Sequence, residues 1–175
     1  IASDGDEATI RALISAKSDL DVEDRDGNTA LIYAAQNNNV GGVKAIIRGK
    51  PNLNKQNKNG YNALMIASEN GNEELVRSLI SAKADLNRQD KDGNTALMYA
   101  AGRGNDKVIR ILNRNGSNIN TQNRVGYTAL FFAAVNGYEQ VVQMLIELNA
   151  NVDIKDNYGK TALIYAKEKG YDSIV

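Results

Sequence analysis

Apolar residues along this chain recur with the spacing of short amphipathic helices, as residues 90–122 show. The first predicted helix of this segment carries small apolar residues at positions i, i+3, i+4 and i+7, namely Leu97, Ala100, Ala101 and Gly104. A second apolar face follows it, formed by Val108, Ile109, Ile111 and Leu112. Gly93, Gly104 and Gly116 stand at the intervening turns, where glycine accepts a positive φ angle without strain. The pattern therefore predicts two short antiparallel helices joined by turns.

The same pattern returns every 33 residues. The turn glycine that opens each unit stands at positions 27, 60, 93, 126 and 159, and no insertion or deletion disturbs the period. A column of small side chains keeps the same step: Ala34, Ala67, Ala100, Ala133 and Ala166. Another column holds only Asp or Asn: Asp21, Asn54, Asn87, Asn120 and Asp153. Because one helix pair cannot bury its apolar face alone, we expect neighbouring units to stack.

Two residues after each turn glycine, the chain reads Thr-Ala-Leu-x-x-Ala, with Asn in place of Thr in one unit. This motif resembles the signature of the ankyrin repeat, and the resemblance covers essentially the whole chain. It implies an all-α solenoid of stacked antiparallel helix pairs with short β-turn fingers. It places complete repeats at 24–56, 57–89, 90–122 and 123–155, and partial repeats at 1–23 and 156–175. Neither partial repeat shows a clear polar cap, so we expect a fragment of a longer chain.

The chain departs from the family signature at the position that follows the leucine. The family carries a histidine there, and this chain carries apolar residues: Ile32, Met65, Met98, Phe131 and Ile164. The resemblance implies that this histidine links neighbouring loops by hydrogen bonds. We therefore expect the links to come from packing or from the threonines before the helices: Thr29, Thr95, Thr128 and Thr161. A threonine at this position can also cap the first helix of its repeat.

The ends of the second helices differ along the chain. Lysines stand at 17, 50 and 83, where Gly116 and Asn149 stand in later repeats. A lysine in left-handed geometry costs about 1 kcal/mol relative to glycine. The pair Gly41-Gly42 also weakens the second helix of the first complete repeat. We therefore predict that the N-terminal half is less protected from hydrogen exchange than the C-terminal half.

The composition excludes several kinds of chemistry. The 175 residues include no histidine and no cysteine, which removes histidine bases, thiolate nucleophiles and Cys/His zinc sites. The 21 basic residues equal the 21 acidic ones, and zero net charge disfavours binding to nucleic acid or anionic membranes. No apolar segment approaches the roughly 18 residues of a membrane span. We expect a protein that is not an enzyme and needs no cofactor or metal. The compartment stays open between cytoplasm, periplasm and secretion.

Two turns read Asp-x-Asp-Gly, like part of a calcium-binding loop. When Gly27 is aligned with the invariant glycine of an EF-hand, Val22 falls in the first ligand position and Tyr33 in the last. Neither residue supplies a carboxylate, and the second turn, at 90–93, fails in the same way. The repeat turn explains both segments, so we predict no calcium site.

Three columns beside the turn glycine are expected at the fingertips. The column two residues before it is cationic in four repeats: Arg25, Lys58, Lys91 and Arg124. The next column holds Asp26, Asn59, Asp92, Val125 and Tyr158. The column after the glycine holds Asn28, Tyr61, Asn94 and Tyr127. In arrays of this kind the tips and inner helices form a concave binding face, and Tyr and Arg are enriched at binding hot spots.

The first helix of each repeat adds a second band to this face. The helical spacing predicts that three side chains of these helices face away from the buried stripe: Glu69, Arg103 and Val135. One residue before the alanine column stands a nearly aromatic column: Tyr33, Ile66, Tyr99, Phe132 and Tyr165. These rings either pack between repeats as core or line the floor of the groove. The face is expected to be most apolar near Val125 and Tyr158.

These observations predict a non-catalytic, monomeric scaffold that binds another protein on its concave face. The repeats fix one another, so the face loses little entropy on association. Arg124→Ala and Tyr127→Ala are each expected to weaken binding without changing helicity. Two alternatives stay open. The array can be the targeting module of a larger enzyme or effector, or its tip cations can bind a phosphorylated or anionic ligand, although Asp26 and Asp92 count against the latter.

Overall fold

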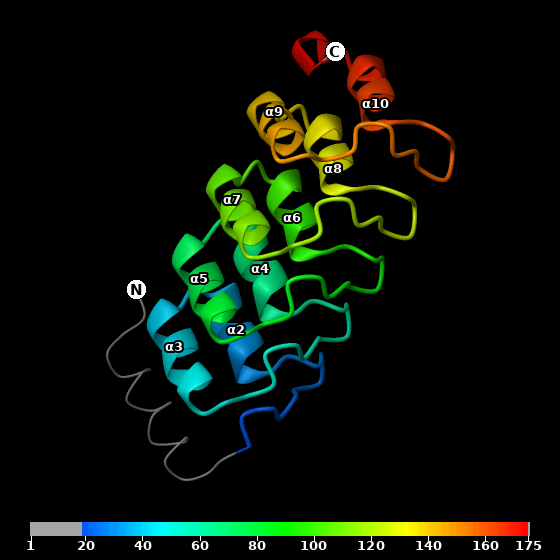
Figure 1. The fold of residues 1–175 in the computed structure, drawn as a ribbon. Coiled ribbons are helices and arrows are strands. Elements are labelled where there is room, and N and C mark those ends of the chain that lie inside the picture. The colour runs from blue at the N-terminus through cyan, green and yellow to red at the C-terminus, as the bar shows by residue number, and fades with distance from the viewer. Residues whose placement is uncertain (1–18, 175) are drawn as a thin grey trace.

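The computed structural model describes residues 19–174, which form a stack of short helices (Figure 1). Within these residues the elements are α2 (Ala30–Gln36), α3 (Val40–Arg48), α4 (Ala63–Glu69), α5 (Glu73–Ser81), α6 (Ala96–Gly102), α7 (Asp106–Arg114), α8 (Ala129–Val135), α9 (Glu139–Glu147), α10 (Ala162–Glu168) and the 3₁₀ helix η1 (Asp172–Ile174). No strand occurs in this part of the chain. The all-α architecture predicted from the sequence is confirmed.

The helices lie in two rows (Figure 1). The inner row contains α2, α4, α6, α8 and α10, and the outer row contains α3, α5, α7 and α9. Each inner helix contacts the next inner helix and the outer helix of its own repeat. The segment that leads from each outer helix to the next inner helix extends to one side of the stack as a finger. The expected helix of the first partial repeat, at Ile10, Leu13 and Ile14, lies outside the described residues.

The core runs continuously between the two rows. The alanine column is buried throughout, so neighbouring inner helices approach closely. The apolar residues at the family's histidine position fill the space above it: Ile32, Met65, Met98 and Phe131 are each 1% exposed. Leu163 and Ile164 occupy equivalent places on α10 but are 47% and 40% exposed, because no further helix pair covers α10 within the described residues.

The inner helices begin at the predicted capping positions, but the caps differ in quality. The Oγ1 atoms of Thr29 and Thr95 each accept the backbone N–H of the third residue of the helix, at 3.4 Å. Asn62 makes the same bond at 2.9 Å. Thr128 and Thr161 make no side-chain cap bond. The capping expectation is therefore confirmed for Thr29 and Thr95 and wrong for the two later threonines.

Glutamine side chains, and not threonines, link neighbouring fingers. The Nε2 atom of Gln56 donates to the carbonyl oxygens of Gly60, 2.6 Å away, and of Gln89, 2.8 Å away in the next repeat. Gln89 and Gln122 repeat this arrangement one and two repeats further on. The sequence expectation assigned these links to packing or threonine hydroxyls. It was wrong about the threonines because their short side chains, where they bond at all, bond to their own helix.

The Asp/Asn column also links neighbouring repeats by hydrogen bonds. The Oδ1 atoms of Asp21, Asn54, Asn87 and Asn120 each accept a backbone N–H from the following repeat at 2.8–2.9 Å. The donors are Asn52, Asp85, Asn118 and Asn151. Each of these bonds provides an acceptor for a backbone N–H that lies outside the helices. Each bond also fixes the separation of two successive repeats.

The outer helices end in left-handed residues, as predicted. Lys50 and Lys83 have φ angles of 56° and 71°, Gly116 has 94° and Asn149 has 67°. The two described lysines therefore carry the backbone strain that the sequence indicated. Lys17 lies outside the described residues.

Candidate partner-binding surface

Each finger is a five-residue turn with the same backbone bonds. In residues 24–28 the N–H of Asp24 donates to the carbonyl of Asn28, and the N–H of Gly27 donates to the carbonyl of Asp24, both at 3.0 Å. The same two bonds close the fingers at 57–61, 90–94, 123–127 and 156–160. The turn needs a positive φ at its glycine, which is 78° at Gly27. This requirement explains the unbroken glycine column of the sequence.

Successive fingertips pack backbone against backbone. The N–H of Lys58 donates to the carbonyl of Asp26 at 2.8 Å, and the N–H of Arg124 donates to the carbonyl of Asp92 at 2.9 Å. A Cβ atom added to Gly60 would lie 2.6 Å from the backbone nitrogen of Lys91. Glycine is therefore required at this position both for its φ angle and for the approach of the next finger. The tips form one row with a fixed spacing.

The structure sorts the sixteen predicted surface residues by exposure. Ten of them are exposed: Arg25, Asp26, Lys58, Asn59, Lys91, Asp92, Arg103, Arg124, Val125 and Tyr158. Five are half-buried: Tyr61, Glu69, Asn94, Tyr127 and Val135. Asn28 is buried. We use the name finger surface for the ten exposed residues together with Val135.

The cations of the finger surface differ in their partners. The guanidinium of Arg103 donates to Oε1 of Glu69 at 2.7 Å, and this hydrogen bond raises the pKa of Arg103. Arg25, Lys58, Lys91 and Arg124 form no ion pair with any residue of 19–174. Four tip cations therefore face solvent without a fixed counter-charge, whereas the cation on the inner helix is already paired.

The fingers are of two kinds that alternate along the stack. Odd fingers, at 24–28, 90–94 and 156–160, begin with Asp, and even fingers, at 57–61 and 123–127, begin with Asn. In the odd repeats a tyrosine nine residues after this Asp donates its hydroxyl to the carboxylate. Tyr33 does so to Asp24 at 2.5 Å, and Tyr165 does so to Asp156 at 2.7 Å. Tyr99 makes the same bond to Asp90.

These bonds shift the pKa values of Asp24, Asp156 and the three tyrosines. The hydrogen bond from Tyr33, aided by the backbone N–H of Asn28, lowers the pKa of Asp24 to about 2. Burial would raise the pKa of Asp156, but hydrogen bonds from Tyr165 and from two backbone N–H groups outweigh it and lower the pKa. Burial and the bond to Asp90 raise the pKa of Tyr99. Asp24 and Asp156 are thus held ionised, and the three tyrosines neutral.

The even fingers complete this arrangement. The Nδ2 atom of Asn57 donates to Oδ1 of Asn28 at 3.0 Å, and Asn123 donates to Asn94 at 2.8 Å. In the even fingers the residue after the glycine is a tyrosine whose ring packs on the tyrosine of the next odd repeat. The ring centroids of Tyr61 and Tyr99 lie 5.3 Å apart. The repeating unit is therefore a pair of ankyrin-like units, 66 residues long, which the 33-residue period alone conceals.

Two sequence predictions change at this point. Asn28 is buried, and its side chain already bonds to Asp24 and Asn57, so it has little left to offer a partner. The ring of Tyr127 lies 4.9 Å from that of Phe131 and 5.6 Å from that of Tyr165. Replacing Tyr127 with alanine therefore removes internal packing, so it does not isolate a binding effect.

The aromatic column combines both roles that the sequence left open. Ile66 is buried, and Tyr99, Phe132 and Tyr165 are half-buried against the core. Tyr33 is 46% exposed, although its hydroxyl is bonded. The column therefore packs mainly between repeats and offers only the edges of its rings to the finger side.

The C-terminal end of the finger surface is apolar. Val125 is 43% exposed and Tyr158 is 78% exposed. The two residues belong to adjacent fingertips, because the N–H of Asn157 donates to the carbonyl of Val125 at 3.1 Å. An apolar hollow of about 190 Å³ lies among the helices of this end, lined by Leu130, Ala134, Val142, Ile146, Val152, Ala162, Leu163 and Ile174. The repeat pattern does not predict this hollow, because the leucines equivalent to Leu163 are buried in every earlier repeat.

The family profile described as ankyrin repeats (3 copies) matches residues 1–90, 41–123, 64–156 and 105–175 of this chain. The chain belongs to the ankyrin-repeat family. The match extends over both partial repeats as well as the four complete ones. No curated protein matches the chain. Ankyrin repeats are in general protein–protein interaction modules, and the family is typically non-catalytic.

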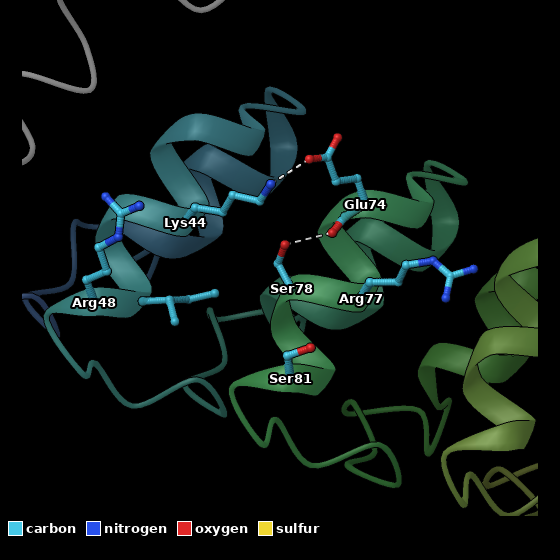
Figure 2. Close-up of a pocket in the computed structure, with 7 residues that line it drawn as sticks. Lys44, Arg48, Glu74, Arg77, Ser78 and Ser81 are labelled. Carbon is cyan, nitrogen blue, oxygen red and sulfur yellow. Dashed lines mark hydrogen bonds and ion pairs between the residues drawn. The ribbon is translucent and has the colours of Figure 1, made fainter.

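The outer side of this ankyrin-repeat array has a hollow of its own. It has a volume of about 410 Å³, lies between α3 and α5, and is lined by Lys44, Ile47, Arg48, Glu74, Arg77, Ser78 and Ser81 (Figure 2). Lys44 Nζ lies 2.6 Å from Glu74 Oε1 across its upper end. The side chains of Arg48 and Arg77 point away from each other in Figure 2. Its polar groups do not converge on one point, so we assign it no ligand.

Two other kinds of feature are absent from residues 19–174. These residues contain no group of three or more Asp or Glu residues placed to hold a metal ion. No helix among them has the length and apolar character needed to cross a membrane.

Proposed function

We propose that this ankyrin-repeat array binds a partner protein on the finger surface, the face that the sequence predicts to be concave. The observation that carries the proposal is the row of exposed tip residues, in which backbone hydrogen bonds join Lys58 to Asp26, Arg124 to Asp92 and Asn157 to Val125. A binding face that is rigid before the encounter loses little conformational entropy on association. The exposed residues include Arg, Val and Tyr side chains without internal partners, which are suited to form a hot spot.

The array acts as a scaffold in this proposal, and no bond is made or broken. Its contribution is geometry: the glutamine and Asp/Asn links between fingers keep the tips in register while the inner helices provide a firm base. Binding energy then comes from a few contacts at the tips. We expect the apolar pair Val125 and Tyr158 to contribute most, because both rest on the surface and neither supports the fold.

Co-purification from the source organism, followed by mass spectrometry, identifies the partner, and two variants then test the face. Tyr158→Ala is expected to weaken binding by about tenfold or more, which corresponds to a hot-spot contact of at least 1.4 kcal/mol. Arg110→Ala, on the outer face of α7, is the matched control and is expected to leave the affinity unchanged. Loss of binding in the outer-face variant, with no loss in the fingertip variant, would contradict the proposal.

A further inference from the structure

The charge of the fingertips follows the alternation of odd and even fingers. At the odd tips each cation is followed directly by an exposed carboxylate, as in Arg25-Asp26 and Lys91-Asp92. At the even tips the cation stands beside a neutral residue, as in Lys58-Asn59 and Arg124-Val125. All four cations are exposed, but only the even ones have no acid within their own finger.

The odd fingers contain a second carboxylate as well. Asp24 accepts hydrogen bonds from the N–H groups of Asp26 and Asn28 and from Tyr33, and these bonds keep it ionised beside Arg25. Asp90 holds the equivalent place beside Lys91. The even fingers carry Asn57 and Asn123 at this position. Lys58 and Arg124 are therefore the two tip cations with no acid in their own finger, whereas Asp26 and Asp92, on the preceding fingertips, each directly follow a cation of their own.

We propose that the partner contributes an extended acidic peptide segment whose carboxylates bind Lys58 and Arg124, an inference that rests on the proposed function. Neighbouring packed helices lie about 10 Å apart, so positions two repeats apart are separated by about 20 Å. An extended chain rises about 3.3 Å per residue, and two carboxylates that reach both cations therefore lie about six residues apart. Arg124 presents the planar fork that binds a carboxylate through two parallel hydrogen bonds.

The neighbours of Arg124 add a third requirement. Val125 follows it in the same fingertip, and Tyr158 lies on the adjacent tip. The segment is thus expected to carry an apolar side chain next to the carboxylate that Arg124 binds. At Lys58 the neighbours are Asn59 and the paired tip of Arg25 and Asp26, which offer no apolar contact. The two ends of the peptide are therefore distinguished, and its direction along the stack is fixed.

A synthetic peptide tests this inference without knowledge of the partner. The probe is a peptide of extended, proline-containing sequence whose only charged side chains are two Glu residues six positions apart, with a Leu beside one of them. Its binding to the ¹⁵N-labelled chain is followed through the backbone amide signals of 58 and 124. We expect Lys58→Ala and Arg124→Ala each to weaken binding about threefold to fivefold, as for exposed ion pairs. Arg25→Ala and Lys91→Ala are expected to weaken it less than either of these, because both cations stand beside a carboxylate of their own finger. Arg110→Ala, outside the finger surface, is the control and is expected to change it by less than twofold.

Several results would overturn the inference. Equal losses in all four fingertip variants would show an unspecific attraction of anions to the row of cations, as would equal binding of a peptide with the two Glu residues adjacent. Equal binding of single-stranded DNA would have the same meaning. If the peptide fails but Tyr158→Ala still weakens binding of the partner, the acidic segment is refuted and the proposed function stands. If the partner does not bind the finger surface, the acidic-segment inference and the proposed function are both wrong.

Discussion

The hydroxyl of Tyr99 donates a hydrogen bond to Oδ2 of Asp90 and so joins the inner helix α6 to the finger that precedes it. Asp90 is buried, and its other carboxylate oxygen accepts the N–H groups of Asp92 and Asn94 at 2.8 and 2.7 Å. The ring of Tyr99 is also packed by Tyr61 from the preceding repeat. One tyrosine thus connects a finger, its own helix and the neighbouring even repeat.

Tyr99→Phe is expected to destabilise the array by about 1 kcal/mol or slightly more. The substitution keeps the ring packing and removes one donor from a buried carboxylate, and a hydrogen bond to a charged group contributes about 1.5–3 kcal/mol. Urea unfolding followed by circular dichroism measures the change. Tyr158→Phe is the control, since Tyr158 is exposed and its hydroxyl makes no bond within the described residues. Equal stability of the two variants would show that the Tyr99–Asp90 bond contributes nothing.

The array is expected to lose stability in acid as Asp24 becomes protonated. The pKa of Asp24 falls from 3.8 to about 2 on folding, so its contribution is complete above the unfolded value and disappears as the pH falls towards 2. Asp24→Asn removes this dependence. The urea midpoints of the two proteins are therefore expected to converge between about pH 4 and pH 2. Parallel curves over that range would contradict the assignment.

The tyrosines of the odd repeats predict a matching loss in alkali. The pKa of Tyr99 is raised above its ordinary value of 10.0, by burial first and then by the bond to Asp90. A group whose pKa is raised on folding contributes its full stabilisation at pH values below its unfolded pKa. This contribution is lost as the pH rises above that value. Between pH 10 and pH 12, the native protein is expected to lose more stability than the Tyr99→Phe variant. A larger loss in the variant would reverse the sign of the effect.

The sequence predicts the helices and fingers of this array because their causes are local and repeated. The glycine column and the alanine column each record one requirement in every repeat. The alternation of odd and even fingers was also present in the sequence, as Asp and Tyr nine residues apart at 24 and 33, and Asn and Tyr four apart at 57 and 61. A comparison of single columns does not reveal this alternation, because it lies in the pairing of the first finger residue with a tyrosine of a different column.

Other features depend on neighbours that a single repeat does not reveal. Asn28 and Asn94 occupy the same column and each accepts a hydrogen bond from the asparagine of the next finger, yet Asn28 is buried and Asn94 half-buried. Leu163 matches four buried leucines in the sequence and is exposed because no helix pair covers it within residues 19–174. The direction of a hydroxyl or amide, and hence the choice between a core and a surface role, is settled by packing across repeats.

Ser68→Ala is expected to stabilise the array by about 1 kcal/mol. Ser68 lies on α4 in a column that holds alanine at Ala35, Ala101 and Ala134. Its side chain is fully buried, and its Oγ atom has no hydrogen-bond partner among the described residues. Removing an unsatisfied buried hydroxyl recovers part of its desolvation cost of about 1–3 kcal/mol, and alanine is the better helix former.

Ser78→Ala on α5 is the matched control for this substitution. The hydroxyl of Ser78 donates to the carbonyl of Glu74 at 2.8 Å, so its loss also removes a hydrogen bond. Thermal unfolding of both variants is expected to raise the midpoint for Ser68→Ala and to leave it nearly unchanged for Ser78→Ala. A lower midpoint for Ser68→Ala would show that its hydroxyl has a partner.

The left-handed lysines predict that the N-terminal half of the array opens locally more readily than the C-terminal half. Lys83 holds a φ angle of 71°, and glycine adopts this geometry without the clash that costs other residues about 1–2 kcal/mol. Lys83→Gly is therefore expected to stabilise the array by about 1 kcal/mol. Gly116→Ala is expected to destabilise it by a similar amount, because Gly116 has a φ angle of 94° and no neighbour within 4 Å of an added Cβ, so backbone strain acts alone.

Hydrogen exchange measures where this strain is felt. The repeat at 24–56 ends its outer helix at Lys50 and carries Gly41 and Gly42 within α3, whereas the repeat at 123–155 ends at Asn149 and has no glycine within α9. Strain and flexible glycines both lower the free energy of local opening. Amides of α3 are therefore expected to exchange faster than those of α9, and Lys50→Gly is expected to narrow the difference. Equal protection of the two helices in the native protein would refute the explanation.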